Sequence, residues 1–464
     1  MKAKRFFALL LVAVMLFTLG ACGAKEKPAK TNSGDKEEKV ELVKDLGGYE
    51  FVIATYVGEP QAGSEINDEI IAINKLIEKQ YNCKIVYDYY EPVSFYDVVG
   101  TKILAGDKVA DLLDMTIYSL GSFMKEGQLY NLKILPNFNM EDTCWNKSYF
   151  DSTTVKSGTY GIGGSMLNSE GVGALLYNKD ILKKQGLKDP AEYIDEGKWT
   201  WDSFKLLLSK TAKDLNNDGT FSSADDQFGF LTANYDGMLN FFRSSGIDMI
   251  KQEKEVLKYN LDTSEGHSAL AKLKDMFSMP GAINPGASIN YSDGQQLWAR
   301  GRVAFYADFA SLRVDRENFA DVDFNVGMVP FPMGPSAKSY ISSVSHNGNI
   351  MAVPVTITDP EKTGIILTAL AKEYEKRNIL GMRQEDALSG LTDEKSRELV
   401  EEYLFKNISF DPTIIHQTAN IKVYNATDCV VGNPIILHPD ETYQYYIGMY
   451  KTTCEKELEA ISNY

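Results

Sequence analysis

The spacing of apolar residues near the start of the folded region predicts alternating strands and helices. Residues 50–56 form a short run of β-branched, aromatic and other apolar residues, and Ser64 then precedes a helical pattern with Ile66, Ile70, Ile73 and Ile77 on one side. Residues 84–89 predict a second strand, residues 95–104 a second helix and residues 110–117 a third strand. This alternation predicts a parallel sheet covered by helices, whose ligands bind in the loops after the strands.

The amino terminus has the pattern of an export signal. Lys2, Lys4 and Arg5 precede an apolar run of 14 residues, Phe6 to Leu19, which is shorter than a membrane span of roughly 20 residues. The following Gly20-Ala21-Cys22 completes a sequence that resembles the bacterial lipobox, although Gly20 stands where Ala or Ser is more frequent. The resemblance implies that residues 1–21 are removed and that Cys22 carries acyl chains, which anchor the protein to the outer face of the cell membrane.

The segment after Cys22 predicts a flexible tether. Lys25 to Glu41 is charged and polar and contains no aromatic residue, so it cannot bury enough apolar surface to offset the entropy of ordering. We therefore assign residues 22–45 to a lipidated tether and expect the folded part to begin near Leu46.

Composition and charge exclude several classes of function. The chain has 464 residues, of which 44% are hydrophobic and 24% charged, so it is neither fibrous nor wholly disordered. Its net charge of −16 becomes −19 once the three cations of residues 1–21 are removed, and this charge disfavours nucleic-acid binding. The four histidines have no zinc-site spacing, and the cysteines after Cys22 form no C-x-x-C pair; a disulfide between Cys429 and Cys454 stays open.

Six short motifs in a constant order resemble those of bacterial extracellular solute-binding proteins, the sugar-binding lipoproteins of ABC importers. They extend across residues 50–360, and the last hundred residues match only as a helical tail. The motifs are LAGD at 104–107 with ADLL at 110–113, GQLYNL at 127–132, LYNKD at 176–180, WTWD at 199–202, WARGRVAF at 298–305 and VPFP at 329–332.

The resemblance implies an α/β fold of the type II periplasmic-binding-protein class. It has two lobes, each with a mainly parallel sheet flanked by helices, and three crossings between the lobes. In this sequence the first lobe comprises residues 46–168 and 327–355, and the second comprises residues 169–326 and 356–464. The crossings fall near residues 165–173, 326–332 and 353–358, and the glycines of 161–173 give the first crossing the freedom of a hinge.

One loop has the ligand pattern of an EF-hand calcium site. Oxygen-bearing side chains stand at alternate positions, Gly219 occupies loop position 6, and the closing carboxylate is an Asp in place of the usual Glu. The candidate ligands are Asp214, Asn216, Asp218, Thr220, Ser222, Asp225 and Asp226. Relatives carry a structural calcium loop at this place, so we expect a stabilising Ca²⁺. The alternatives are a polar turn that caps a helix and a dockerin module, although no second loop of this kind exists.

Position in the predicted fold selects the candidate ligand-binding residues. Sugars require aromatic surfaces together with carboxylate, amide and guanidinium groups, and these must follow the strands. The candidates are Tyr56, Glu59, Asp114 and Tyr118 in the first lobe, Glu170 on the first crossing, and Asp308, Phe309 and His346 toward the second lobe. Trp201 and Trp298 are assigned to the core because of their helical spacing and their place in the motifs.

These observations and the family resemblance predict a monomeric, lipid-anchored binding protein that captures a carbohydrate, in particular an oligosaccharide, and delivers it to ABC permease subunits. No catalytic signature is present, so we expect no enzymatic activity. Two alternatives stay open: an extracellular glycoside hydrolase that uses two carboxylates, and a calcium-dependent polysaccharide-binding surface lipoprotein without a transporter. The sequence does not identify the sugar, and peptide, polyol or phosphorylated ligands also stay open.

Overall fold

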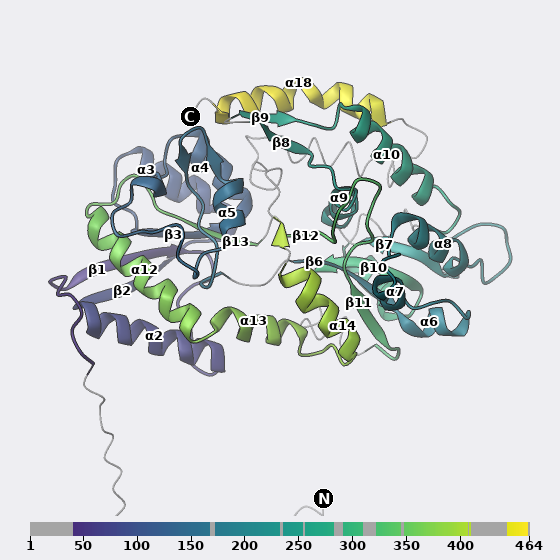
Figure 1. The fold of residues 1–464 in the computed structure, drawn as a ribbon, viewed down its shortest axis with the longest axis horizontal. Helices are drawn as coiled ribbons and strands as arrows, with labels where there is room; N and C mark the ends of the chain where they lie inside the picture. Colours follow the sequence, from purple (N-terminus) through teal and green to yellow (C-terminus); the bar gives the residue numbers. More distant parts are fainter. Residues whose placement is uncertain are drawn as a thin grey trace, which may run out of the picture. The chain divides into compact units, whose positions relative to one another are not determined.

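The chain forms two four-stranded sheets in a computed structural model (Figure 1). The structure describes residues 40–167, 172–232, 235–253, 256–282, 291–309, 322–344, 348–406, 408–409 and 443–462. The predicted signal peptide and most of the predicted tether, with Cys22, lie outside these residues.

The first sheet is built from the predicted strand and helix alternation. Its strand order is β13-β3-β1-β2, with β1 (Tyr49–Thr55) parallel to both β2 (Cys83–Tyr89) and β3 (Leu112–Thr116). The edge strand β13 (Asn349–Ala352) returns from far along the chain and runs antiparallel to β3. The predicted parallel arrangement of the first three strands is confirmed.

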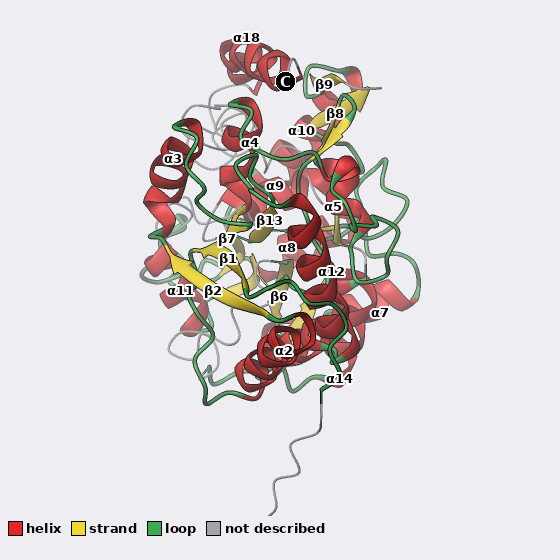
Figure 2. Ribbon diagram, turned by 90° about the vertical axis from the view of Figure 1, so that its left-hand side faces the viewer, coloured by secondary structure: helices red, strands yellow, loops and turns green. Residues whose placement is uncertain are grey.

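The helix α2 (Glu65–Tyr81) begins and ends where local chemistry predicts. The Ser64 hydroxyl accepts a hydrogen bond from the Asn67 N–H at 3.2 Å, and Asn82 ends the helix in the left-handed conformation with φ of 45°. Ile70, Ile73 and Ile77 are buried, and α2 packs against α12 (Pro360–Lys376) on one side of the sheet. Figure 2 shows these helices and the strands from the side of the first sheet.

Shorter elements complete the cover of the first sheet. The predicted helix over residues 95–104 is divided into a π-helical turn and a short α-helix. The elements are η1 (Pro92–Ser94), η2 (Tyr96–Gly100), α3 (Thr101–Leu104), α4 (Ile117–Lys125), η3 (Leu132–Ile134), α5 (Lys147–Ser152), β4 (Thr154–Val155), β5 (Gly158–Thr159) and α13 (Ile379–Leu388).

The second sheet is mixed, whereas the resemblance implied a mainly parallel one. Its order is β11-β6-β10-β7, with β6 (Gly173–Asn178) antiparallel to both β10 (Val303–Phe309) and β11 (Val326–Val329). Only β10 and β7 (Phe228–Thr232) form a parallel pair in this sheet of the described chain. The expectation is corrected because β6 and β10 run in opposite directions, so no parallel βαβ crossover joins them.

Helices cover both faces of this sheet, and small hairpins and bridges accompany them. The further elements are α6 (Lys179–Lys184), α7 (Pro190–Asp195), α8 (Trp201–Thr211), α9 (Tyr235–Arg243), β8 (Ile250–Glu253), β9 (Val256–Tyr259), α10 (Ser264–Phe277), α11 (Tyr291–Ala299), β12 (Ser342–Ser343), α14 (Glu394–Leu399), η6 (Val400–Phe405), β14 (Ile408–Ser409) and α18 (Tyr443–Ser462).

The core has one cluster at the first sheet and two at the second. The first core cluster includes Phe51, Ile73 and Leu112. Alternation along β6 and β10 separates a second core cluster, which contains Tyr177 and Phe305, from a third, which contains Leu176 and Tyr306. Trp201 is buried in the second cluster and Trp298 in the third, which confirms their assignment to packing.

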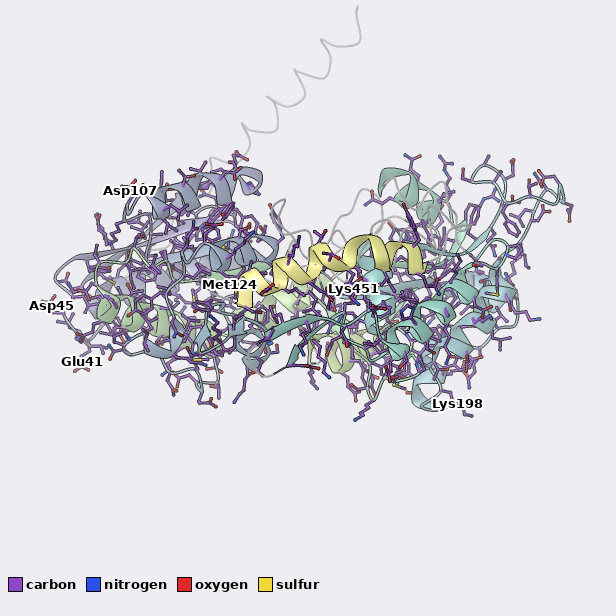
Figure 3. The ribbon with its side chains drawn as sticks, turned by 90° about the horizontal axis from the view of Figure 1, so that it is seen from above. Glu41, Asp45, Asp107, Met124, Lys198 and Lys451 are labelled. Carbon is purple, nitrogen blue, oxygen red and sulfur yellow. The ribbon has the colours of Figure 1, made fainter. Side chains whose placement is uncertain are left out.

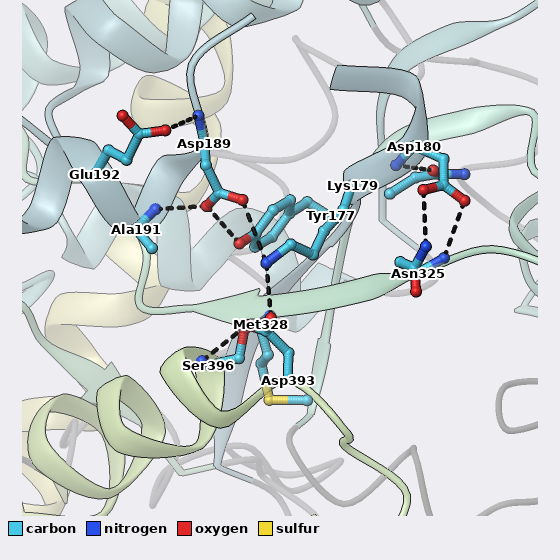
Figure 4. Close-up of polar contacts among 11 residues, drawn as sticks. Tyr177, Lys179, Asp180, Asp189, Ala191, Glu192, Asn325, Met328, Asp393 and Ser396 are labelled. Carbon is cyan, nitrogen blue, oxygen red and sulfur yellow. Dashed lines mark hydrogen bonds and ion pairs between the residues drawn. The ribbon is translucent and has the colours of Figure 1, made fainter. Parts of the chain in front are cut away.

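The LYNKD motif is a framework element of the second sheet (Figure 4). The Tyr177 hydroxyl donates to Asp189 at 2.7 Å, the Asn178 side chain caps α6, and Asp180 accepts two hydrogen bonds from Asn325. The Lys179 ammonium lies 2.7 Å from Asp393 and 3.4 Å from Asp189.

The ion pairs of Lys179 with Asp189 and Asp393 keep its partly buried ammonium group charged. Burial lowers the pKa of Lys179, but the neighbouring carboxylates outweigh burial and raise it. Burial likewise raises the pKa of Asp393, and the hydrogen bonds from Lys179 and Ser396 reverse that effect. Lys179, the first residue of α6, therefore joins this helix to the start of α7 and to the start of α14, which is distant in sequence.

The chain passes between the two sheets at places that differ from the predicted boundaries. The predicted first lobe includes residues 327–355, yet β11 pairs with β6 in the second sheet. The predicted second lobe begins again at residue 356, yet α12 packs in the first core cluster through Ile366, Leu367 and Leu370. The reason is that α12 presents an apolar face to α2 and the first sheet, so burial of that face keeps it there.

The glycines before the first crossing serve close packing. A Cβ atom at Gly163 would lie 2.2 Å from the Tyr149 ring, and one at Gly164 would lie 2.1 Å from the Cys144 carbonyl oxygen. Gly164 also has a φ of 145°, which L side chains rarely adopt. At these two positions a larger side chain would collide with neighbouring atoms, and at Gly164 the backbone conformation also requires glycine. The sequence had instead led us to expect that these glycines provide the flexibility of a hinge.

The helix α18 joins two core clusters at the end of the chain. Cys454, Leu458 and Ile461 are buried in the first cluster, whereas Ile447 is buried in the second. Figure 3 shows α18 in yellow with Lys451 labelled, and Lys451 pairs with Asp262 at 2.5 Å. Met124 is labelled in the same view and belongs to α4, which contacts α18.

Two cysteines of the described chain are buried free thiols. Burial raises the pKa of Cys83 to about 11 and that of Cys144 to about 12, so neither is a thiolate at neutral pH. Cys429 lies outside the described residues, and its pairing with Cys454 stays untested.

Candidate ligand-binding site

A cavity of about 280 Å³ lies in the first lobe, where β1 and β3 end. Its apolar lining includes Ile53, Ile70, Leu112, Met166 and Met351. Its polar lining consists of Glu59, Gln61, Asn67, Asp114, Asn349 and Arg383, together with Tyr87 and Tyr374. The combination of an apolar floor with a few polar groups is typical of small-molecule sites.

The strand register explains how these residues meet. Ile53 pairs with Leu112 and Thr55 with Asp114 across the parallel strands, and Met351 stands opposite Asp114 across β13. Side chains alternate along a strand, so residues at these positions share one face of the sheet. The loop after β1 adds Val57 to Gln61 at the same edge, as expected for the carboxyl ends of parallel strands.

Asp114 is held by two hydrogen bonds from neighbouring strands. Its Oδ2 accepts from the Thr55 hydroxyl at 3.0 Å, and its Oδ1 accepts from the Asn349 amide at 3.1 Å. Burial raises the pKa of Asp114, although Asn349, Thr55 and the charge of Arg383 act in the opposite direction. Asp114 is therefore a fixed acceptor in a site where its charge is costly.

Arg383 reaches this cavity from α13. Its Nη1 donates to the carbonyl oxygens of Met166 at 3.0 Å and Leu167 at 2.8 Å. The guanidinium therefore fixes backbone at the side of the cavity while it contributes positive charge to the lining.

Only two of the predicted first-lobe ligand-binding residues line the cavity. Glu59 and Asp114 both line the cavity. Tyr56 is half-buried after β1 and packs against the first core cluster. The Tyr118 hydroxyl donates to the Pro92 carbonyl at 3.3 Å, and Tyr118 is absent from the cavity lining. Glu170 lies outside the described residues.

Polar groups also gather where β10 ends in the second sheet. Asp308, only 2% exposed, stands in β10 opposite Ala174, and Phe309 is the last residue of that strand. Nearby α9 contributes Arg243, which donates to the Ser343 hydroxyl at 2.6 Å. His346 lies outside the described residues, so the second-lobe candidates are only partly placed.

The predicted calcium loop is closed by its own hydrogen bonds. Asp214 accepts from the Asn217 and Gly219 N–H groups, and Asp218 accepts from the Thr220 N–H and hydroxyl. Among the described residues, no three His, Cys, Asp or Glu side chains are gathered as a metal site. The donor oxygens nevertheless suit Ca²⁺, and each Asp214 carboxylate oxygen accepts one of these hydrogen bonds, which leaves it a second lone pair.

The two closing aspartates of this loop have different surroundings. Asp226 is fully buried and accepts hydrogen bonds from the Leu215 and Ser222 N–H groups, both at 2.8 Å. Asp225 is exposed, and its backbone carbonyl accepts from Arg302 at 3.0 Å. Asp226 thus joins the two ends of the loop. Asn216 accepts from the Asp218 N–H, whereas Thr220 and Ser222 contribute their own N–H groups to Asp218 and Asp226.

Sequence reasoning missed Asn349 and Arg383, which line the cavity, and Thr55, which donates to Asp114. Thr55 is the last residue of β1, and Asn349 stands in the same SHNGN stretch as His346, three residues later. Both Thr55 and Asn349 stand near the end or start of a predicted strand, which marks them as possible site residues. Only the register of β13 against β3 shows that Asn349 reaches Asp114. Arg383 lies in the tail where the family motifs end, and no sequence signal marked it.

Comparison with known proteins assigns the family. A model described as bacterial extracellular solute-binding protein matches residues 63–374, which is well over half of the chain. The chain belongs to this solute-binding protein family. A search of curated proteins found no match.

Solved structures share the fold of this solute-binding protein at low sequence identity. A cyclic alpha-maltosyl-1,6-maltose binding protein from Arthrobacter globiformis has 15% identity and a TM-score of 0.63, covering 89% of this chain and 100% of its own. A family 1 extracellular solute-binding protein from Bifidobacterium longum subsp. infantis has 16% identity and a TM-score of 0.60 over 89% and 100%. An ABC substrate-binding protein from Listeria monocytogenes in complex with cycloalternan has 16% identity and a TM-score of 0.56 over 90% and 98%.

These likenesses confirm the type II periplasmic-binding-protein-like fold with two lobes. Membership of an extracellular family implies an exported protein. In the part of the chain that the structure describes, no helix is both long and apolar enough to cross a membrane.

The surroundings of Asp114 predict a stabilising effect of Asp114→Asn. A raised pKa means that the folded state holds the proton more tightly than the unfolded chain, so ionised Asp114 lowers the free energy of unfolding. This cost is absent below the unfolded pKa of 3.8 and complete above the folded pKa. We expect Asp114→Asn to raise the free energy of unfolding at pH 7 by about 0.5–2 kcal/mol.

Denaturant unfolding between pH 7 and pH 4 measures this effect. The advantage of Asp114→Asn should shrink as the pH falls toward 3.8, because wild-type Asp114 then takes up a proton. The control is Asp107→Asn, which removes an exposed carboxylate on the same lobe and should change little. A variant Asp114→Asn that is less stable than wild type at pH 7 contradicts the interpretation.

Proposed function

We propose that the protein binds a carbohydrate, in particular an oligosaccharide, between its two lobes and delivers it to the permease subunits of an ABC importer. The observation that carries the proposal is the cavity at the ends of β1 and β3, where Asp114 is fixed by Thr55 and Asn349 above an apolar floor. A carboxylate with this geometry accepts sugar hydroxyl groups, and the apolar floor suits the C–H face of a ring.

The fold relatives add support for a sugar ligand. One binds cyclic alpha-maltosyl-1,6-maltose according to its name, and another was solved with cycloalternan. A ligand that contacts both lobes favours the closed arrangement by its differential affinity, and no bond of the ligand has to break. The protein acts as a monomer in this proposal, because one chain supplies both lobes.

Titration calorimetry with cycloalternan, cyclic alpha-maltosyl-1,6-maltose and maltotriose tests the proposal. We expect at least one of these sugars to bind wild type with one site per chain. Asp114→Asn should weaken that binding about tenfold or more, since hydrogen bonds to a charged group contribute about 1.5–3 kcal/mol. Asp107→Asn should leave the affinity unchanged.

The same titrations separate the proposal from its rivals. Loss of affinity in Asp114→Asn without loss of stability locates the site at the cavity. An equal affinity of wild type and Asp114→Asn contradicts this location. Both Glu59 and Asp114 line the cavity, so the sugars should also be recovered and examined by mass spectrometry. Their hydrolysis indicates a glycoside hydrolase with paired carboxylates, and binding only to polymers indicates a polysaccharide-binding surface protein.

We also propose that the 214–226 loop binds Ca²⁺ as a structural ion. The alternating Asp214, Asn216 and Asp218, with Gly219 at a φ of 83°, supply oxygen donors on a tight turn. The proposed ligands include the fully buried Asp226, which already joins the two ends of the loop. The ion would offset the repulsion between these carboxylates and add no chemistry at the cavity.

Removal of calcium with EDTA is expected to lower the melting temperature and leave sugar binding intact. At a calcium concentration about 100 times Kd, binding contributes about 2.7 kcal/mol to the free energy of unfolding. Scanning calorimetry of wild type and of Asp214→Asn/Asp218→Asn, with and without calcium, measures the difference. Calcium should not change the melting temperature of the double variant, whereas it should raise that of the control Asp275→Asn as it does for wild type. If calcium does not change the melting temperature of wild type, the proposed site is wrong.

We propose further that Cys22 is acylated and holds the protein on the outer face of the cell membrane. The basis is the lipobox-like Leu19-Gly20-Ala21-Cys22 after a short apolar run. In a bacterial host, wild type should partition into the detergent phase of Triton X-114 and Cys22→Ser into the aqueous phase. Cys83→Ser is the matched control and should partition like wild type. Wild type in the aqueous phase would overturn the proposal.

A further inference from the structure

The helix α13 connects the first core cluster with the third. Ile379 at its start is fully buried in the first cluster. Leu388 at its end and Leu391 just beyond it are buried in the third cluster, on one face of the second sheet. The chain therefore passes from one lobe to the other along α13, which also packs against α2 and α12 of the first lobe.

Arg383 lies midway along α13 and ties it to a second segment that leaves the first lobe. Its Nη1 donates to the carbonyl oxygens of Met166 and Leu167 at 3.0 Å and 2.8 Å. Leu167 is buried in the first core cluster, and Val172, five residues later, is buried in the third. The Arg383 guanidinium thus joins the middle of α13 to the end of the first-lobe segment at Met166 and Leu167.

The same side chain lines the cavity that holds Asp114. Arg383 and Asp114 are both part of the lining, and the charge of Arg383 acts on the Asp114 carboxylate. Guanidinium is planar and keeps its charge and its donors in a rigid fork, so a shift of the group is transmitted to the backbone it binds. A ligand that engages Asp114 therefore lies next to the group that joins α13 to the end of this first-lobe segment.

We propose that Arg383 is a positioning residue that sets the angle between the lobes and links it to occupancy of the Asp114 cavity. The first part concerns the protein without ligand, whereas the link to occupancy rests on the proposed binding function. Arg383 acts through the carbonyl groups of Met166 and Leu167, and its hydrogen bonds hold α13 and the end of this first-lobe segment at a fixed separation.

The test compares Arg383→Met with Arg383→Lys and with a matched control. Arg383→Met removes the charge and both hydrogen bonds but keeps much of the apolar stem. Arg383→Lys keeps the charge near Asp114 and loses the planar fork. The control is Arg377→Met, because Arg377 is a partly buried arginine at the end of α12 that pairs with Glu69 at 2.6 Å.

Single-molecule energy transfer between fluorophores at positions 79 and 183 reports the interlobe distance. Lys79 of α2 and Lys183 of α6 are exposed, and labels attached through p-acetylphenylalanine avoid the cysteines. Without ligand, Arg383→Met should broaden the distance distribution of the full chain, Arg383→Lys should restore it in part, and Arg377→Met should match wild type. A purely structural role would lower the melting temperature without changing this distribution.

The unliganded measurement decides the first part of the proposal even if none of the sugars binds. An Arg383→Met distribution that superimposes on wild type overturns it, and so does equal broadening in Arg377→Met. The second part uses maltotriose or whichever of the named sugars binds wild type. Arg383→Met should then weaken binding about tenfold, because fewer molecules hold the competent arrangement. Unchanged affinity overturns the link to occupancy.

Discussion

The hydrogen bond between Asn349 and Asp114 depends on the most distant strand pairing of the first sheet. These residues are 235 positions apart, and they meet because β13 returns to lie antiparallel beside β3. The strands of the second sheet lie between β3 and β13 in the sequence, and β13 nevertheless pairs beside β3. The fixing of Asp114 by Asn349 is therefore a product of the whole fold.

The family motifs act in the framework more than in the site. In LYNKD, Tyr177, Lys179 and Asp180 bind other parts of the second lobe, and Asn178 caps the helix that begins at the next residue. Both tryptophans of WTWD, Trp199 and Trp201, and that of WARGRVAF are buried in core clusters. Such motifs identify a fold well, because they hold distant elements together, and the same role makes them poor guides to the ligand.

Local patterns were reliable wherever the interactions involved were local. Ser64 caps α2, the apolar positions of α2 are buried, and the first three strands are parallel, all as the spacing predicts. Predictions of which lobe a segment belongs to failed where that depends on contacts with residues distant in sequence. The Val326–Val329 strand reads like the end of a lobe in sequence, but β6 recruits it into the second sheet. In the same way, the apolar face of α12 finds α2 and the first sheet, so the helix stays with the first lobe.

The sequence by itself predicted an export signal, and it determined the elements of the first lobe, the family, and the choice of Asp114 and Glu59 as candidates, since each rests on local spacing or position after a strand. Only the tertiary structure decided which groups hold Asp114, where the chain passes between the lobes, and that Arg383 stands beside the cavity. The physical reason is that hydrogen bonds and burial act between neighbours in space. Asn349 and Arg383 become neighbours of Asp114 only through the return of β13 and the path of α13.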